Sequence, residues 1–293
     1  MQTEYEAATG PLGPIQWTVI EPTRAWAALR LGELWRAREL VFFLTWRDVK
    51  VRYKQTAIGA GWAVLQPLIT VAIFTLIFGR VAHLPSGGRP YLIFVFAAML
   101  PWSYFAYSIT QSGKSLVDNE KLITKVYFPR LALPIAATLT GLVDFAVGCG
   151  VFAVMMVIFG VAPTWRLLLL PCFLLMAIAA ALGVGFWLSG MNVRYRDVKY
   201  VLPFLTQIWL FASPVAYTAG VVKGKLALVY ALNPMAGVID GFRWALLGPA
   251  PHGSAATGFN PAMLIPSILV TIALLAGGVF YFKHMDKVFA DVI

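Results

Sequence analysis

The 293-residue sequence is 60% hydrophobic and only 12% charged, with a formal net charge of +10. A soluble domain carries about 25% charged residues, so this composition excludes an ordinary soluble protein. The apolar residues also form long runs: between Leu131 and Gly190 only Asp144 and Arg166 are charged. Runs of this length predict an all-α integral membrane protein, because helices satisfy their own backbone in lipid.

Residues 1–32 form an N-terminal segment that we expect to be cytoplasmic. It has acidic residues early and no compact apolar stretch, so it does not resemble a cleaved signal peptide. The membrane spans themselves are expected to act as insertion signals.

Residues 33–57 predict an amphipathic helix in the cytoplasmic interface. One face is expected to collect Leu34, Trp35, Val41, Phe42 and Trp46. Basic residues decorate the remainder, among them Arg36, Arg38, Arg47, Lys50, Arg52 and Lys54. Extending the first span backward through this segment would place five charges in the bilayer, which is costly.

Residues 58–293 predict a transmembrane domain with six spans of about 20 residues. The predicted spans are Ile58–Gly79, Tyr91–Ser112, Leu131–Phe159, Leu167–Ser189, Tyr200–Tyr217 and Pro261–Phe282. With both termini cytoplasmic, the inner connections hold 17 of the 23 Lys and Arg residues and the outer connections hold 6. This asymmetry follows the positive-inside rule, and it explains the net charge without nucleic acid.

Residues 218–260, between the last two predicted spans, contain two apolar pieces too short to cross a bilayer. Asn233 suits a helix N-cap and Pro234 suits the first helical position. A seventh crossing would place Lys283 and Lys287 outside, against the charge rule. We therefore expect short re-entrant helices that enter the membrane from outside, beside protein or a water-filled cavity.

No catalytic or metal site is predicted. The three histidines (His83, His252 and His284) lie in separate connections, and Cys149 and Cys172 lie in apolar runs that favour a packing role. Ser108–Ser115 resembles a phosphate-binding loop, but it lacks the first glycine and ends a span instead of following a strand. If ATP drives this protein, we expect another chain to bind it.

Asp144 lies within a predicted span and has two possible roles. A carboxylate at that depth needs a partner, a proton or a wet cavity. It is either a residue of the transport pathway, or a structural residue bonded to a polar side chain such as Gln66 or Gln207.

Aromatic residues gather within the second predicted span. Trp102, Tyr104 and Phe105 either belong to the ordinary interfacial belt or stack on sugar rings. Trp102 and Phe105 are spaced to share a helical face. The hypothesis is that this pair faces a central pathway.

Five segments, in order, resemble the permease subunit of polysaccharide ABC exporters, the type-2 exporters of O-antigen, capsule and teichoic acid. The segments are Trp46–Gln55 with Gly59 and Trp62, Leu100–Trp102, Asn119–Arg130, Asn192–Val198, and Ser213–Val215 followed by Asn233–Arg243.

The resemblance implies a homodimer with two separate ATP-binding subunits, which hold ATP and Mg²⁺, in the bacterial inner membrane. It implies that residues 117–128 form a coupling helix on the ATPase, with Asn119, Glu120, Lys121, Leu122, Lys125 and Tyr127 as coupling residues. It also implies an outer gate that includes Asn233, Pro234, Asp240 and Arg243. The substrate implied is a lipid-linked glycan.

Alternative functions remain at this point. A type-2 exporter of a small amphipathic drug or lipid would share the six-span plan. A membrane glycosyltransferase would need a cluster of acids or histidines at one interface, and the sequence has none. An ATP-independent flippase or channel would not stimulate ATP hydrolysis in a partner.

Overall fold

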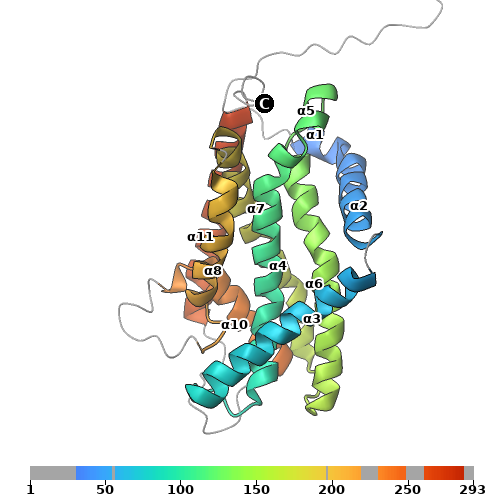
Figure 1. The fold of residues 1–293 in the computed structure, drawn as a ribbon. Coiled ribbons are helices and arrows are strands. Elements are labelled where there is room, and N and C mark those ends of the chain that lie inside the picture. Colours follow the sequence, from blue (N-terminus) through green and yellow to red (C-terminus); the bar gives the residue numbers. More distant parts are fainter. Residues whose placement is uncertain (1–30, 55–56, 196, 219–229, 249–260, 287–293) are drawn as a thin grey trace, which may run out of the picture.

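The computed structural model describes residues 31–54, 57–195, 197–218, 230–248 and 261–286, and every element within these ranges is helical (Figure 1). The helices are α1 (Leu31–Arg36), α2 (Arg38–Lys54), α3 (Ala57–Phe74), α4 (Tyr91–Asp118), α5 (Glu120–Lys125), α6 (Ala132–Ile158), α7 (Leu170–Arg194), α8 (Val198–Phe211), α10 (Pro234–Leu247) and α11 (Pro261–Asp286). A π-helix, η1 (Thr75–Val81), continues α3, and a 3-10 helix, η2 (Trp165–Leu169), precedes α7.

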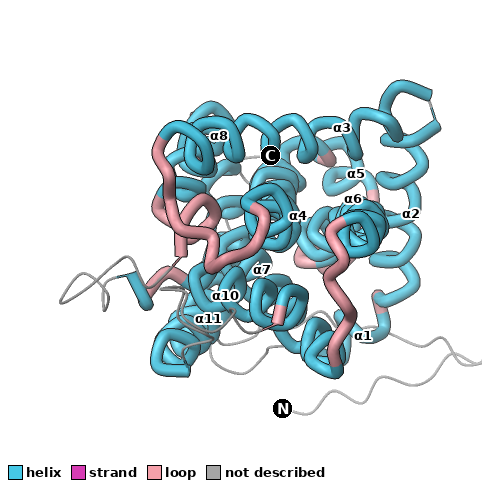
Figure 2. Tube along the Cα trace, turned by 90° about the horizontal axis from the view of Figure 1, so that it is seen from below, coloured by secondary structure: helices cyan, strands magenta, loops and turns pink. Residues whose placement is uncertain are grey.

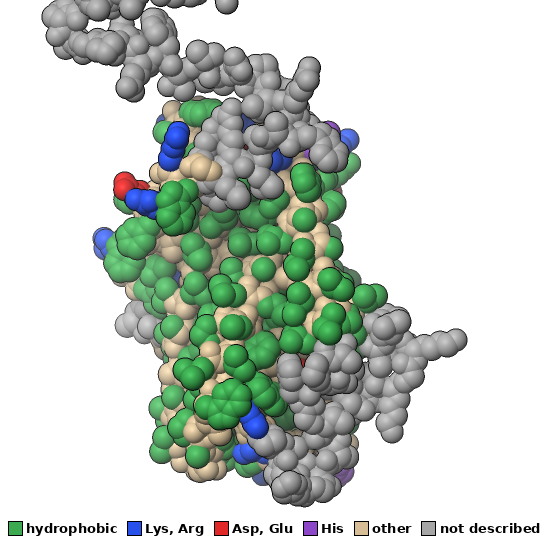
Figure 3. All heavy atoms as spheres, turned by 180° about the vertical axis from the view of Figure 1, so that it is seen from behind, with side chains coloured by type: hydrophobic (Ala, Val, Ile, Leu, Met, Phe, Trp, Pro, Cys, Tyr) green, Lys and Arg blue, Asp and Glu red, His purple; other side chains and the backbone are tan. Residues whose placement is uncertain are grey.

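Five helical segments within the described ranges are long and apolar enough to cross a membrane. They are Val64–Val81, Tyr91–Asp118, Ala132–Ile158, Trp165–Arg194 and Leu264–Asp286. Figure 3 shows hydrophobic side chains over the middle of one face and Lys and Arg side chains toward its two ends. This distribution suits a bundle whose middle part lies in the hydrocarbon core of a bilayer.

The fifth predicted span, Tyr200–Tyr217, is shorter than expected. It corresponds to α8, which has 14 residues and is therefore about 21 Å long at 1.5 Å per residue. Helical geometry stops at Phe211, shortly before Ser213-Pro214, and proline disfavours helical backbone in the preceding residue. The described helices thus include five full-length candidate spans and one short apolar helix.

Helix α4 is the central element of the bundle. Of its span, 78% is buried, and α6, α7, α10 and α3 surround it (Figure 2). Helices α7 and α11 pack closely because glycines meet at their crossing. A Cβ atom on Gly278 would lie 2.4 Å from the carbonyl oxygen of Gly183, so the two backbones could not approach this closely with larger residues.

The predicted interface helix differs from expectation in extent, buried face and direction. Residues 33–57 divide into α1, α2 and the first residue of α3. The buried residues of α2 are Val41 and Leu44, whereas Phe42 and Trp46 are exposed. The apolar residues therefore surround the helix instead of sharing one face.

Helix α2 runs alongside α6 and in the same direction (Figure 1). The Thr45 hydroxyl donates to the Val41 carbonyl over 2.8 Å, and its oxygen lies 3.5 Å from the Ala136 carbonyl oxygen; eight residues later Tyr53 donates to Asp144. The constant separation of 91 residues along the chain means that the helices remain in register between these contacts. Helix α2 therefore reaches about halfway along α6.

The two ends of the bundle are defined by contacts between chain segments. Arg130, which follows α5, pairs with Asp286 at the end of α11 over 3.2 Å. The Asn192 amide near the end of α7 donates to the Gly113 carbonyl in α4 over 3.0 Å. The ends of α4, α7 and α11 therefore gather at one end of the bundle, hereafter the α5 end. The opposite end holds η1, η2 and the beginning of α4.

Candidate functional site

The short helix α5 stands exposed at the end of α4 (Figure 1). Glu120, Lys121 and Lys125 are exposed, and Tyr127, just beyond the helix, is 87% exposed. Leu122 and its neighbour Ile123 instead pack on the second apolar cluster of the bundle, formed with α2, α6, α7 and α11. An apolar underside thus holds this charged segment against the bundle and leaves its outer face open for a partner.

Asn119 forms the junction between α4 and α5. Its amide donates to the Ser115 carbonyl over 2.8 Å, and its side-chain oxygen accepts a hydrogen bond of 2.9 Å from Arg47 of α2. Arg47 also pairs with Asp48 over 2.8 Å. The structure thus brings together one predicted interface residue, Arg47, and one predicted coupling residue, Asn119.

Asp144 of α6 is bound by two residues at the end of α2. Arg52 approaches one carboxylate oxygen to 2.7 Å, and the Tyr53 hydroxyl donates to the other. The guanidinium of Arg52 also lies 4.4 Å from the ring centre of Tyr107 in α4. This polar cluster (Arg52, Tyr53, Tyr107 and Asp144) joins three helices.

The electrostatics of the polar cluster agree with this bonding. Burial, together with the hydrogen bond to Asp144, raises the pKa of Tyr53 to about 12. Tyr53 is therefore protonated at neutral pH and acts as the donor. Desolvation favours the neutral phenol, and the adjacent carboxylate disfavours a second negative charge.

The partners of Asp144 differ from those considered from sequence. They are Arg52 and Tyr53, and not Gln66 or Gln207, which are exposed. Tyr53 was part of the quoted segment Trp46–Gln55, but its pairing depends on the parallel register of α2 and α6. The residue pattern within one segment cannot predict how two helices are aligned with each other.

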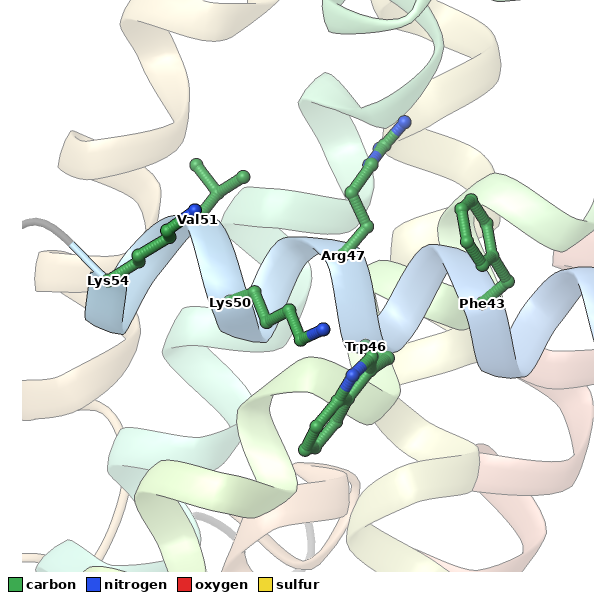
Figure 4. Close-up of a pocket in the computed structure, with 6 residues that line it drawn as sticks. All are labelled: Phe43, Trp46, Arg47, Lys50, Val51 and Lys54. Atoms are coloured by element: carbon green, nitrogen blue, oxygen red, sulfur yellow. The ribbon is translucent and has the colours of Figure 1, made fainter.

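The exposed side of α2 forms a shallow groove of about 360 Å³ (Figure 4). Its lining residues are Phe43, Trp46, Arg47, Lys50, Val51 and Lys54, of which Trp46, Arg47 and Lys54 were predicted as interface residues. The Lys50 ammonium lies 5.5 Å from the ring centre of Trp46. A cation beside an exposed indole is typical of a side chain at a membrane surface.

The aromatic residues at the second span are core residues in this chain. Trp102, Tyr104 and Phe105 are 3%, 2% and 0% exposed. Trp102 and Phe105 do share a face, with ring centres 5.7 Å apart, and Phe105 meets Trp209 of α8 edge-on. Their rings are covered by protein, in contrast to the expectation that they face an open pathway.

The predicted gate residue Asn233 caps α10 and ties it to the segment that follows α8. Its side-chain oxygen accepts from the Met235 amide over 3.0 Å and from the Trp209 indole over 3.0 Å. Its side-chain amide donates to the Ala212 carbonyl and the Ser213 hydroxyl. Pro234 takes the first helical position, as predicted.

Arg243 is buried and satisfied by backbone. It donates to the carbonyls of Tyr217 and Val215 over 2.8 and 2.6 Å, and more weakly to that of Phe94 over 3.4 Å. Its guanidinium also lies over the Phe94 ring. Asp240 is half-buried one turn earlier. Arg243 therefore fastens the turn after α8 to α10 and the beginning of α4.

Comparison with known proteins identifies the family. Residues 39–247 match the family model of the ABC-2 type transporter membrane domain. The chain belongs to the ABC-2 type transporter family. This match runs from α2 through α10 and so covers both the predicted coupling segment and the predicted gate.

Relatives of this ABC-2 family member include proteins named for polysaccharide export. The O-antigen export system permease protein RfbA of Myxococcus xanthus is 28% identical over 263 residues, which are 89% of this chain and 98% of that protein. The protein of the same name from Klebsiella pneumoniae is 24% identical, covering 87% of this chain and 95% of its own length. The polysialic acid transport protein KpsM of Escherichia coli is 22% identical over 69% of this chain and 78% of its own length.

Proposed function

We propose that this chain is the membrane subunit of an ATP-driven exporter that moves a lipid-linked polysaccharide across the bacterial inner membrane. The observation that carries the proposal is the family match over residues 39–247 together with relatives named as O-antigen permeases. The apolar helices suit a membrane subunit, and the exposed α5 suits a partner subunit.

ATP hydrolysis is assigned to a separate subunit that holds ATP and Mg²⁺. A complex of two copies of this chain with two ATP-binding subunits is part of the proposal. Glu120, Lys121, Lys125 and Tyr127 on and beside α5 are the docking residues, because they are exposed while Leu122 is held by the bundle. Arg47 would transmit force from α5 to α2 through Asn119.

We propose six passages through the membrane, with both termini cytoplasmic. Helix α7 ends at the α5 end, and α11 also ends there, so the chain between them must reach the opposite end of the bundle. Helix α8 provides that passage despite its length. The re-entrant part of the proposal then rests on α10, since the remainder of residues 218–260 lies largely outside the described residues.

Reconstitution tests the function. The purified complex with its ATP-binding subunits should hydrolyse ATP faster when the proteoliposomes contain lipid-linked glycan, and glycan should appear on the far side. Amphipathic drugs should not substitute. Stimulation by drugs alone would favour the second candidate, an exporter of small amphipathic molecules. Absence of any stimulated hydrolysis would contradict an ATP-driven exporter.

Cysteine labelling tests the topology. After Cys149 and Cys172 are replaced by serine, a cysteine at His83 should react with an impermeant thiol reagent added outside intact cells. A cysteine at Lys125 should react only after the membrane is opened. Both positions are exposed in the structure, so access depends on the side of the membrane. Outside labelling at Lys125 would contradict the orientation.

A further inference from the structure

Three segments bring basic and aromatic side chains together at the end of the bundle opposite α5. Arg89 lies two residues before α4, Trp165 and Arg166 lie in η2, and Gly248 ends α10. A Cβ atom on Gly248 would lie 3.5 Å from one Arg166 nitrogen and 3.8 Å from one Arg89 nitrogen. Two guanidinium groups therefore converge on a single point of the backbone.

Arg166 has hydrogen-bond donors that the chain does not use. Within the described ranges, its Nε and Nη1 atoms are buried and have no hydrogen-bond partner. Buried donors without partners are rare, because each forfeits the hydrogen bonds that it made with water. The ion pairs found among described residues join Arg47 to Asp48, Arg52 to Asp144 and Arg130 to Asp286, and leave Arg166 without a carboxylate.

Two indoles complete this corner of the molecule. The Arg166 guanidinium lies 4.9 Å from the ring centre of Trp244 in α10. Trp165 meets Trp244 edge-on, with ring centres 6.4 Å apart, and is 68% exposed. A stacked guanidinium is held in orientation, and the exposed indole beside it offers a flat apolar face.

A purely structural role for the arginines would be to neutralise the carboxyl end of α10. Cations are favourable at that end of a helix, and Gly248 at φ 74° is a common helix terminus. That role explains the positive charge. It does not explain the orphaned donors, since a capping arginine would direct them at the last carbonyls of the helix.

We propose that Arg166, with Arg89 beside it and the indoles of Trp165 and Trp244, forms a binding site for an acidic sugar residue. A carboxylate or phosphate on the sugar would accept a charge-assisted hydrogen bond from one of the two unused Arg166 donors, Nε or Nη1. The indole of Trp165 would pack against the apolar face of the ring. The assignment of a glycan rests on the proposed function, and in the proposed topology the site faces outside.

The site would receive the glycan after it crosses the membrane. Its ligand class is therefore an acidic polysaccharide, and a neutral polysaccharide would gain nothing from Arg166. The aromatic residues predicted from sequence to stack on sugar, Trp102 and Phe105, are buried in the core, whereas Trp165 is open.

The test uses the purified complex with its ATP-binding subunits in nanodiscs of neutral phosphatidylcholine. The probes are a labelled oligogalacturonate and the same oligosaccharide with its carboxylates methylated. The acid should bind about 10-fold or more tighter than the ester, which corresponds to one charge-assisted contact. Arg166→Gln should remove most of this difference, and Arg166→Lys should restore only part, since lysine keeps the charge but lacks the planar guanidinium that stacks on Trp244.

Arg80→Gln is the matched control. Arg80 is an exposed basic residue at the same end of the bundle but outside the site, so its loss should change affinity less than twofold. If Arg80→Gln and Arg166→Gln lose the same affinity for the acid, the effect comes from general surface charge and the proposed site is wrong. Equal binding of acid and ester would also overturn it, as would an Arg166→Gln variant that binds the acid normally.

Two further measurements separate this inference from its neighbours. If Arg166→Gln weakens binding to phosphatidylglycerol nanodiscs and leaves oligogalacturonate binding unchanged, the ligand is a lipid headgroup and the sugar assignment is wrong. ATP hydrolysis stimulated by lipid-linked glycan reports on the proposed function. If Arg166→Gln keeps this stimulated ATP hydrolysis and also binds the sugar normally, the acidic-sugar site is wrong while the proposed function stands. Gel filtration and thermal melting show whether each variant is folded. If Arg166→Gln is misfolded, the affinity of Arg166→Lys for the acid and the ester tests the site instead.

Discussion

The polar cluster around Asp144 shows how one buried charge organises its neighbours. The carboxylate uses both oxygens, one for Arg52 and one for Tyr53, and Arg52 also covers Tyr107. The side chains of Arg52 and Asp144 are 38% and 23% exposed, so the chain encloses the pair only in part and we expect its net contribution to be modest. Its larger effect is to fix the register between α2 and α6.

Removal of one partner of the ion pair should cost more than removal of both. Arg52→Gln leaves Asp144 with Tyr53 alone, and Asp144→Asn leaves Arg52 unpaired, so each should lower the free energy of unfolding by about 1 kcal/mol. The double variant should recover part of that loss because neither charge is stranded. Detergent unfolding of the four proteins completes the cycle.

Lys54→Gln is the control for this cycle, since Lys54 is exposed at the end of the same helix. It should change stability by less than about 0.5 kcal/mol. Strict additivity of Arg52→Gln and Asp144→Asn would mean that the pair does not couple the two helices.

Arg243 should be more sensitive than any residue of that cluster. It is buried and serves three backbone carbonyls. Arg243→Met should strand those acceptors and destabilise the protein by about 2–5 kcal/mol, which would appear as poor recovery from the membrane and a lower melting temperature. Arg194→Gln, an exposed arginine at the α5 end, should behave like the parent. Normal melting of Arg243→Met would contradict the fastening role.

Among the helices, α5 and α2 depend on one another. Helix α5 has 6 residues, too few to be stable alone, so Leu122, Ile123 and the bond from Arg47 to Asn119 hold it in place. Helix α2 in turn rests on α6. Movement of an ATP-binding subunit against α5 would therefore reach α6 through α2.

Replacing Glu120 and Lys121 together with alanine should separate ATP hydrolysis from export. Both side chains are exposed, so the variant should fold and insert normally, while the glycan-stimulated fraction of ATP hydrolysis falls severalfold. Tyr195→Ala, an exposed aromatic residue at the same end but outside α5, serves as the comparison. Undiminished export by the double variant would exclude α5 as the coupling element.

The burial of Trp102 and Phe105 changes what their substitution should do. Phe105→Ala would leave a cavity beside Trp209 in the main apolar cluster and should destabilise the protein by about 3–5 kcal/mol. Trp165→Ala, which empties an exposed position, should leave melting nearly unchanged. A Phe105→Ala protein that melts normally but fails to export would restore the pathway role.

Considered as a whole, the bundle is organised around α4. That helix is mostly buried, whereas only 11% of the segment Val64–Val81 is buried in the described chain. In a membrane, α4 would therefore lie at the centre of the bundle, whereas Val64–Val81 would face lipid or a second copy of the subunit. The proposed dimer is compatible with that open face.

Much of the molecule was predictable from sequence because lipid imposes strong local rules. Five of the predicted spans and the cap at Asn233 depend on hydropathy or on cap chemistry within one segment. The family was also recognisable, since its short motifs retain their order along the chain. These features require no knowledge of which helices are neighbours.

The remaining features depended on contacts between distant segments. The partners of Asp144, the burial of Trp102 and Phe105, and the meeting of Arg166 with Arg89 all follow from helix packing. Which apolar residues of α2 are buried likewise became clear only with the neighbouring helices in place. Hydropathy reports how apolar a residue is, but in lipid it does not say whether that residue faces protein or the bilayer, because both are apolar. That choice was made by tertiary structure.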